Sequence, residues 1–106
     1  MNSNELKDLA DFQFVRTTFL KNLKESYEAK LTLVHNGGMF LATPNLIAFL
    51  NSWGEPQIFV EDIYQKPILV NRLDLLNQAK SVYLEAMTFW FDEVKQSNRI
   101  RQVKDV

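Results

Sequence analysis

The dipeptide Asn36-Gly37 constrains this 106-residue chain more than any other feature. A two-residue hairpin of type I′ needs positive φ at both central positions, and Asn followed by Gly tolerates this best. β-Prone residues lie on both sides, at 31–35 and 39–42. The sequence therefore predicts a hairpin at this place. Its facing pairs would be His35 with Gly38, Val34 with Met39, and Leu33 with Phe40.

A second hairpin is expected from strands at 58–61 and 67–70. Pro67 cannot donate a ladder hydrogen bond, so its strand begins there or lies at a sheet edge. Apolar residues spaced three and four apart predict three helices around the hairpins. These helices cover residues 4–28, 44–53 and 72–98. Each start carries a capping signal: Ser3 or Asn4, Thr43 followed by Pro44, and Asn71.

The resulting order is helix, hairpin, helix, hairpin, helix. Strands that alternate with helices and are joined by tight turns indicate an α+β fold, in which a small antiparallel sheet made of two β-hairpins packs with three helices. No linker divides residues 1–106, so we expect a single domain with a frayed tail at 99–106. The expected core consists of Phe12, Val15, Phe19, Leu33, Phe40, Leu46, Leu50, Phe59, Leu69, Leu76, Val82 and Phe89.

Composition excludes several classes of protein. The formal net charge is -1, which gives no overall field to attract nucleic acid or an anionic membrane. The chain has no cysteine, so disulfides and thiolate metal sites are excluded. No apolar run approaches the roughly 18 residues of a membrane span, and the polar N-terminal residues do not form a signal peptide. We therefore expect a soluble cytoplasmic protein without a membrane partner.

Few residues have the spacing that chemistry requires. His35 is the only histidine, so it cannot form a multi-histidine metal site, and no local Ser-His-Asp pattern accompanies it. Residues 36–38 are followed by a strand, whereas a phosphate-binding glycine loop leads into a helix. The carboxylate pairs 61–62 and 92–93 lack the alternating ligands of a calcium loop. We predict no catalytic, cofactor-binding or metal-binding residue and no cofactor, which favours a protein that is not an enzyme.

Two alternatives remain open. The first is a small enzyme or ligand-binding domain with a pocket near His35, Glu61 and Tyr64. The second is a nucleic-acid accessory protein that contacts phosphates through the basic C-terminal end. The phosphate-contacting residues would be Lys95, Arg99, Arg101 and Lys104. Cations near a helix C-terminus also favour the helix dipole, so this cluster does not by itself indicate nucleic acid.

The segment 82–91, VYLEAMTFWF, is apolar on nearly every side of the predicted helix. Such a helix must be covered nearly all round, and a small domain offers it only one sheet face. We predict that a second copy covers the remainder, most simply in a two-fold dimer. The predicted interface residues are Tyr83, Met87, Trp90 and Val94. The competing cover for this seam is the helix at 4–28 within one chain. The leading hypothesis is thus a non-enzymatic interaction or assembly protein.

Two stretches, GGMFLATPNLIAFLNSW at 37–53 and VEDIYQKPILVNRLDLL at 60–76, cover about a third of the chain. They resemble segments of small uncharacterised proteins encoded by large contractile-tailed phages, including those of marine cyanobacteria. The resemblance holds no catalytic motif. It implies a phage genome and a place of action in the host cytoplasm or the virion, and it assigns no site residue.

Overall fold

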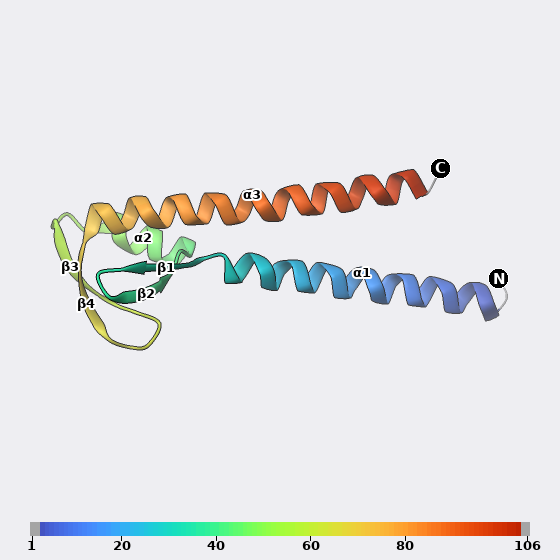
Figure 1. Cartoon of the computed structure of the whole chain (residues 1–106), viewed down its shortest axis with the longest axis horizontal. Helices are drawn as coiled ribbons and strands as arrows, with labels where there is room; N and C mark the ends of the chain where they lie inside the picture. Colours follow the sequence, from blue (N-terminus) through green and yellow to red (C-terminus); the bar gives the residue numbers. More distant parts are fainter. Residues whose placement is uncertain (1–2, 105–106) are drawn as a thin grey trace.

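The computed structural model describes the backbone of residues 3–104 and the side chains of residues 13–98. The predicted α+β class and element order are confirmed (Figure 1). The elements are α1 (Ser3–Ala29), β1 (Thr32–His35), β2 (Gly38–Leu41), α2 (Pro44–Ser52), β3 (Gln57–Glu61), β4 (Pro67–Asn71) and α3 (Arg72–Lys104). The two hairpins pair as two separate two-stranded antiparallel sheets.

The molecule has two regions of different shape (Figure 1). The head comprises residues 32–82, that is, both hairpins, α2 and the first turns of α3. The stalk comprises α1 and the part of α3 from Tyr83 onward, which run side by side in opposite directions away from the head. The chain measures 65 × 26 × 20 Å and has a radius of gyration of 19.9 Å. A compact chain of this length would have a radius of gyration of about 13 Å.

The first hairpin has the predicted turn and register. Asn36 and Gly37 have φ values of 49° and 80°, as a type I′ turn requires. The facing pairs are those expected, with His35 opposite Gly38 at the turn. Gly38 also sets the packing of the two hairpins, because a Cβ added there would lie 2.7 Å from Cγ1 of Ile68 in β4. The backbone of β2 therefore lies directly against a side chain of the second hairpin.

The second hairpin pairs Ile58 with Val70 and Phe59 with Leu69. Its inner face is buried, whereas Phe59 is 70% exposed and Leu69 is 48% exposed on the outer face. The prediction that Phe59 and Leu69 belong to the core is therefore wrong. Both strands are apolar at consecutive positions, so a pattern of period two could not show which face turns inward. Ile58, Val60 and Val70 fill the core instead.

Two of the three helix starts follow the predicted caps, and the side chains of Ser3 and Asn4 at the third lie outside the described residues. The Leu46 N–H donates to Thr43 Oγ1 at 3.2 Å, and the Asp74 N–H donates to Asn71 Oδ1 at 3.2 Å. α3 remains helical to Lys104, so it extends beyond Asn98, where the sequence predicted its end. Residues 105–106 lie outside the described part of the chain.

The main core lies in the head, where α2 and α3 cover the inner faces of the hairpins. Leu33, Phe40, Leu50 and Leu76 are buried as predicted. Leu46 and Val82 pack against the core while remaining partly exposed, and Phe89 is half-buried in the stalk.

Two further residues of the expected core, Val15 and Phe19, are exposed, so their assignment to the core is wrong. They lie on α1, which leaves the head and packs against a single neighbour, α3. The side chain of Phe12, also expected in the core, lies outside the described residues.

Candidate functional site

The single histidine belongs to a structural hydrogen-bond pair. Gln78 Nε2 donates to the Val34 carbonyl at 3.0 Å, so Gln78 Oε1 accepts from the Nδ1–H of His35 at 3.2 Å. The other ring nitrogen, Nε2, is buried and has no hydrogen-bond partner. This arrangement fixes the imidazole between β1 and α3.

The predicted pocket residues His35, Glu61 and Tyr64 lie in different surroundings, and His35 is the only one of the three that is not exposed. Glu61 and Tyr64 are exposed, and the Tyr64 hydroxyl lies 3.9 Å from the Met39 sulfur. Within residues 13–98, no hydrogen bond joins any two of the three predicted residues. The same part of the chain contains no group of three or more His, Asp or Glu side chains that could hold a metal ion.

Among the residues whose side chains are described, Asp62 is the acidic group with the most hydrogen bonds, and the sequence analysis gave it no role. Its carboxylate accepts from the N–H groups of Tyr64 and Lys66, each at 3.0 Å, and from Met39 at 3.3 Å. These bonds tie the β3–β4 loop to β2, and the Ile63 N–H adds a bond to the Met39 carbonyl at 2.9 Å. Hydrogen bonds from the backbone, that of Lys66 first, lower the pKa of Asp62. An Asp side chain in a turn commonly accepts a hydrogen bond from the backbone N–H two residues later. The position of Asp62 at the start of the β3–β4 loop is therefore the available sequence signal for its bond with Tyr64.

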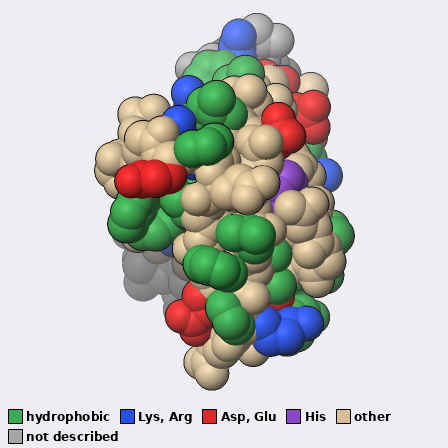
Figure 2. All heavy atoms as spheres, turned by 90° about the vertical axis from the view of Figure 1, so that its left-hand side faces the viewer, with side chains coloured by type: hydrophobic (Ala, Val, Ile, Leu, Met, Phe, Trp, Pro, Cys, Tyr) green, Lys and Arg blue, Asp and Glu red, His purple; other side chains and the backbone are tan. Residues whose placement is uncertain are grey.

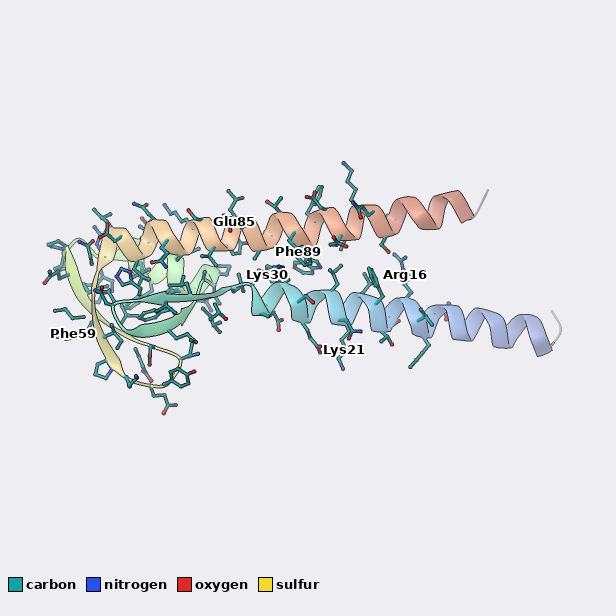
Figure 3. All side chains as sticks on the ribbon, in the orientation of Figure 1. Arg16, Lys21, Lys30, Phe59, Glu85 and Phe89 are labelled. Atoms are coloured by element: carbon teal, nitrogen blue, oxygen red, sulfur yellow. The ribbon has the colours of Figure 1, made fainter. Side chains whose placement is uncertain are left out.

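The stalk interior is an aromatic contact between its two helices. Trp90 of α3 stacks on Tyr27 of α1 with ring centroids 4.7 Å apart, beside the buried Leu31 and Ala86. Tyr83 and Met87 also pack against this cluster. Figure 3 shows Lys30 and Phe89 in the space between the helices, where the Lys30 ammonium lies 4.5 Å from the ring centroid.

The four predicted interface residues therefore do not all have the same surroundings. Trp90 stacks on Tyr27 of α1, which is the competing cover named above, and Tyr83 and Met87 pack against the same cluster of Tyr27, Leu31 and Ala86. Val94 is half-buried on α3. Farther out, Arg16 of α1 donates to Asn98 Oδ1 at 3.2 Å, and Figure 3 shows its side chain directed toward α3. Within one chain Trp90 is therefore packed on α1, and the predicted contact of these four residues with a second copy stays a prediction.

A neighbouring strip of α3, which shares Met87 with the stalk cluster, carries large exposed apolar residues. Leu84 is 66% exposed and Phe91 is 65% exposed. With the half-buried Met87 and Val94 they recur at spacings of three, four and three, which is the a/d pattern of a helix–helix seam. We call Leu84, Met87, Phe91 and Val94 the outer seam. Its first residue also lines an apolar groove of 440 Å³ between α2 and α3, together with Ile47.

The basic end can be placed only in part. Lys95 is exposed on α3, whereas the side chains of Arg99, Arg101 and Lys104 lie outside the described residues. Within the described part of the chain, no helix is both long and apolar enough to cross a membrane. Comparison with protein-family models, with curated proteins and with solved structures yields no match.

Proposed function

We propose that the chain is a non-enzymatic assembly protein that associates with a second copy through the outer seam of its stalk. The observation that carries this proposal is the exposure of Leu84 and Phe91 at helical-seam spacing on a helix whose other face is already packed on α1. Apart from α2, which borders Leu84 at the groove, the described part of the chain has no further element beside this face. A second stalk would complete a four-helix bundle, which is a common way to bury such seams.

The energetics favour a dimer that depends on concentration. Burial of one Leu or Phe side chain contributes roughly 2 kcal/mol, so covering Leu84 and Phe91 in both copies contributes roughly 8 kcal/mol. Association costs about 4–15 kcal/mol in lost freedom of motion. The two terms are comparable, and the additional contacts of Met87 and Val94 decide the balance. We therefore expect the extent of association to depend on protein concentration.

The polar groups beside the outer seam fit this arrangement. Lys80, Asp92 and Lys95 are exposed on α3 and would form the rim of the contact. Two-fold closure requires only that one patch be complementary to itself. The setting that we propose, the host cytoplasm or the virion of a contractile-tailed phage, is supported by the resemblance of residues 37–53 and 60–76 to small phage proteins.

Light scattering over a range of protein concentrations tests the stalk contact. We expect the wild-type mass to reach at least twice 12.4 kDa, and Phe91→Glu to lower it, because a carboxylate would be buried without a partner. The matched control is Phe14→Glu, which makes the same change at a residue of α1 that is 72% exposed and outside the seam. Equal masses for Phe91→Glu and the wild type, or equal losses for both variants, would contradict the proposal.

A further inference from the structure

The strand β3 has an outer edge whose backbone groups are directed away from its partner. The Asp62 N–H donates to the Lys66 carbonyl at 3.0 Å, and the Arg72 N–H donates to the Pro56 carbonyl at 2.9 Å. Hydrogen-bonded pairs alternate along an antiparallel ladder, so the register makes Ile58–Val70 and Val60–Ile68 the bonded pairs. The N–H and C=O of Phe59 therefore point outward, as do those of Gln57 and Glu61.

The opposite edge of this sheet is protected, and the edge at β3 is not. On β4, Asn36 Nδ2 donates to the Leu69 carbonyl at 3.2 Å, and Pro67 has no N–H to offer. No hydrogen bond between the described residues uses the outward groups of Phe59. The strand sequence QIFVE contains neither Lys nor Pro, the residues that commonly block an edge. An open edge with an apolar centre is a template for another strand.

The apolar side chains beside this edge are also exposed to solvent. Figure 3 shows Phe59 at the end of the head, directed away from the helices. Figure 2 looks onto that end of the molecule, where hydrophobic side chains lie exposed among polar ones. Phe59 and Leu69 face each other across the two strands, so they form one apolar pair on the outer face. Such a pair can extend onto a neighbouring strand.

We propose that β3 pairs antiparallel with β3 of a second copy about a two-fold axis at Phe59. The β3–β4 hairpin of each copy then contributes two strands to one four-stranded sheet. Phe59 is the central residue of the five in β3, so the strand is complementary to itself. In this register Gln57 faces Glu61 of the second copy, and no carboxylate faces a carboxylate. Every outward N–H and C=O of Gln57, Phe59 and Glu61 then acquires a partner.

The head contact is independent of the stalk contact because it uses a different region of the chain. If both form, each copy contacts one neighbour through β3 and another through the outer seam, and species larger than a dimer result. Either contact alone gives a dimer. The two proposals can therefore be tested separately with one set of variants.

The test compares Phe59→Lys with Leu69→Lys by light scattering at matched concentrations. Lysine at position 59 places two cations beside the axis and blocks the edge. Lysine at position 69 makes the same type of change on the same face, one strand away from the edge. Both side chains are exposed, so circular dichroism should show that both variants fold like the wild type. We expect Phe59→Lys to lower the wild-type mass and to raise the concentration of half-association at least tenfold, while Leu69→Lys has a smaller effect.

Combination with Phe91→Glu completes the test. We expect Phe91→Glu alone to remain a dimer through the head, and the double variant with Phe59→Lys to have a mass of 12.4 kDa. A Phe59→Lys mass equal to that of the wild type would overturn the head contact, whatever the stalk variant shows. A monomeric Phe91→Glu would also overturn it and leave the stalk contact intact. A double variant that remains a dimer would show that a third surface is used.

Discussion

The head and the stalk contain similar kinds of residues and bury them to very different extents. In the head, Leu50 and Leu75 are fully buried between α2, α3 and the two hairpins. In the stalk, each helix packs against a single partner, and large residues such as Phe14 and Phe91 remain exposed. Apolar composition sets how much surface a chain needs to bury, whereas the number of neighbouring elements sets how much it can bury.

The largest expected effect is at the centre of the head. Leu50→Ala should lower the free energy of unfolding by about 3–5 kcal/mol, because it removes a fully buried side chain from a core with neighbours on every side. Phe14→Ala in the stalk should change it by less than about 0.5 kcal/mol. Denaturant unfolding measures both values, and equal losses would mean that the head and the stalk are packed alike.

The contact between the two hairpins gives the next largest effect. Gly38→Ala introduces a Cβ 2.7 Å from Cγ1 of Ile68 and 3.0 Å from the Phe40 ring, so the sheets must separate slightly. We expect a loss of about 1–3 kcal/mol in unfolding free energy. Gly54→Ala is the matched control, because an added Cβ there meets no atom within 4 Å. Similar midpoints for the two variants would show that the hairpins do not depend on this close approach.

A smaller effect is expected in the stalk. Trp90→Ala removes the stacking on Tyr27 and should destabilise the docking of α1 by about 1–2 kcal/mol. Amide hydrogen exchange should accelerate in α1 while the head amides remain protected, because the buried residues of the stalk and the head form two clusters that share only the partly buried Tyr83. Asp92→Ala, an exposed change on the same helix, should leave both rates unaltered. Acceleration throughout the head would mean that the two regions unfold as one unit.

The smallest expected effect concerns pH. Hydrogen bonds from the backbone lower the pKa of Asp62 below its ordinary value of 3.8, so its charged form stabilises the folded state. This contribution is complete above the ordinary pKa and is lost as pH falls through the lower pKa of the folded state. Asp62→Asn should therefore be less stable than the wild type at pH 7, and the difference should shrink below about pH 4. An equal difference in unfolding free energy between the wild type and Asp62→Asn at pH 7 and at pH 3 would exclude this role.

Local signals in the sequence predicted local structure well. Asn36-Gly37 specified both the turn and the register, because few residue pairs adopt positive φ twice in succession. Thr43 and Asn71 marked helix starts, because a capping side chain acts within its own first turn. These features depend on neighbours in the chain, which a sequence displays directly.

Features that depend on distant neighbours were predicted less well. The runs at 58–60 and 68–70 are wholly apolar, so nothing local places Phe59 and Leu69 outside. Tyr83 and Trp90 were predicted at an interface between two copies, with the helix at 4–28 as the competing cover, because spacing alone does not say which helix covers a seam. The bond from the Met39 N–H to Asp62 crosses between the hairpins and has no signature in spacing, whereas the bonds from Tyr64 and Lys66 lie within the β3–β4 loop.

The two tryptophans of the chain are divided between its two regions. Trp53 follows α2 in the head, with its ring edge-on to Phe49 at 6.0 Å, and Trp90 stacks on Tyr27 in the stalk. Each region therefore contains its own intrinsic fluorophore. Trp53→Phe would leave an emission signal from the stalk alone, and Trp90→Phe would leave one from the head alone. The order in which the two regions unfold can thus be followed by fluorescence without attaching any dye.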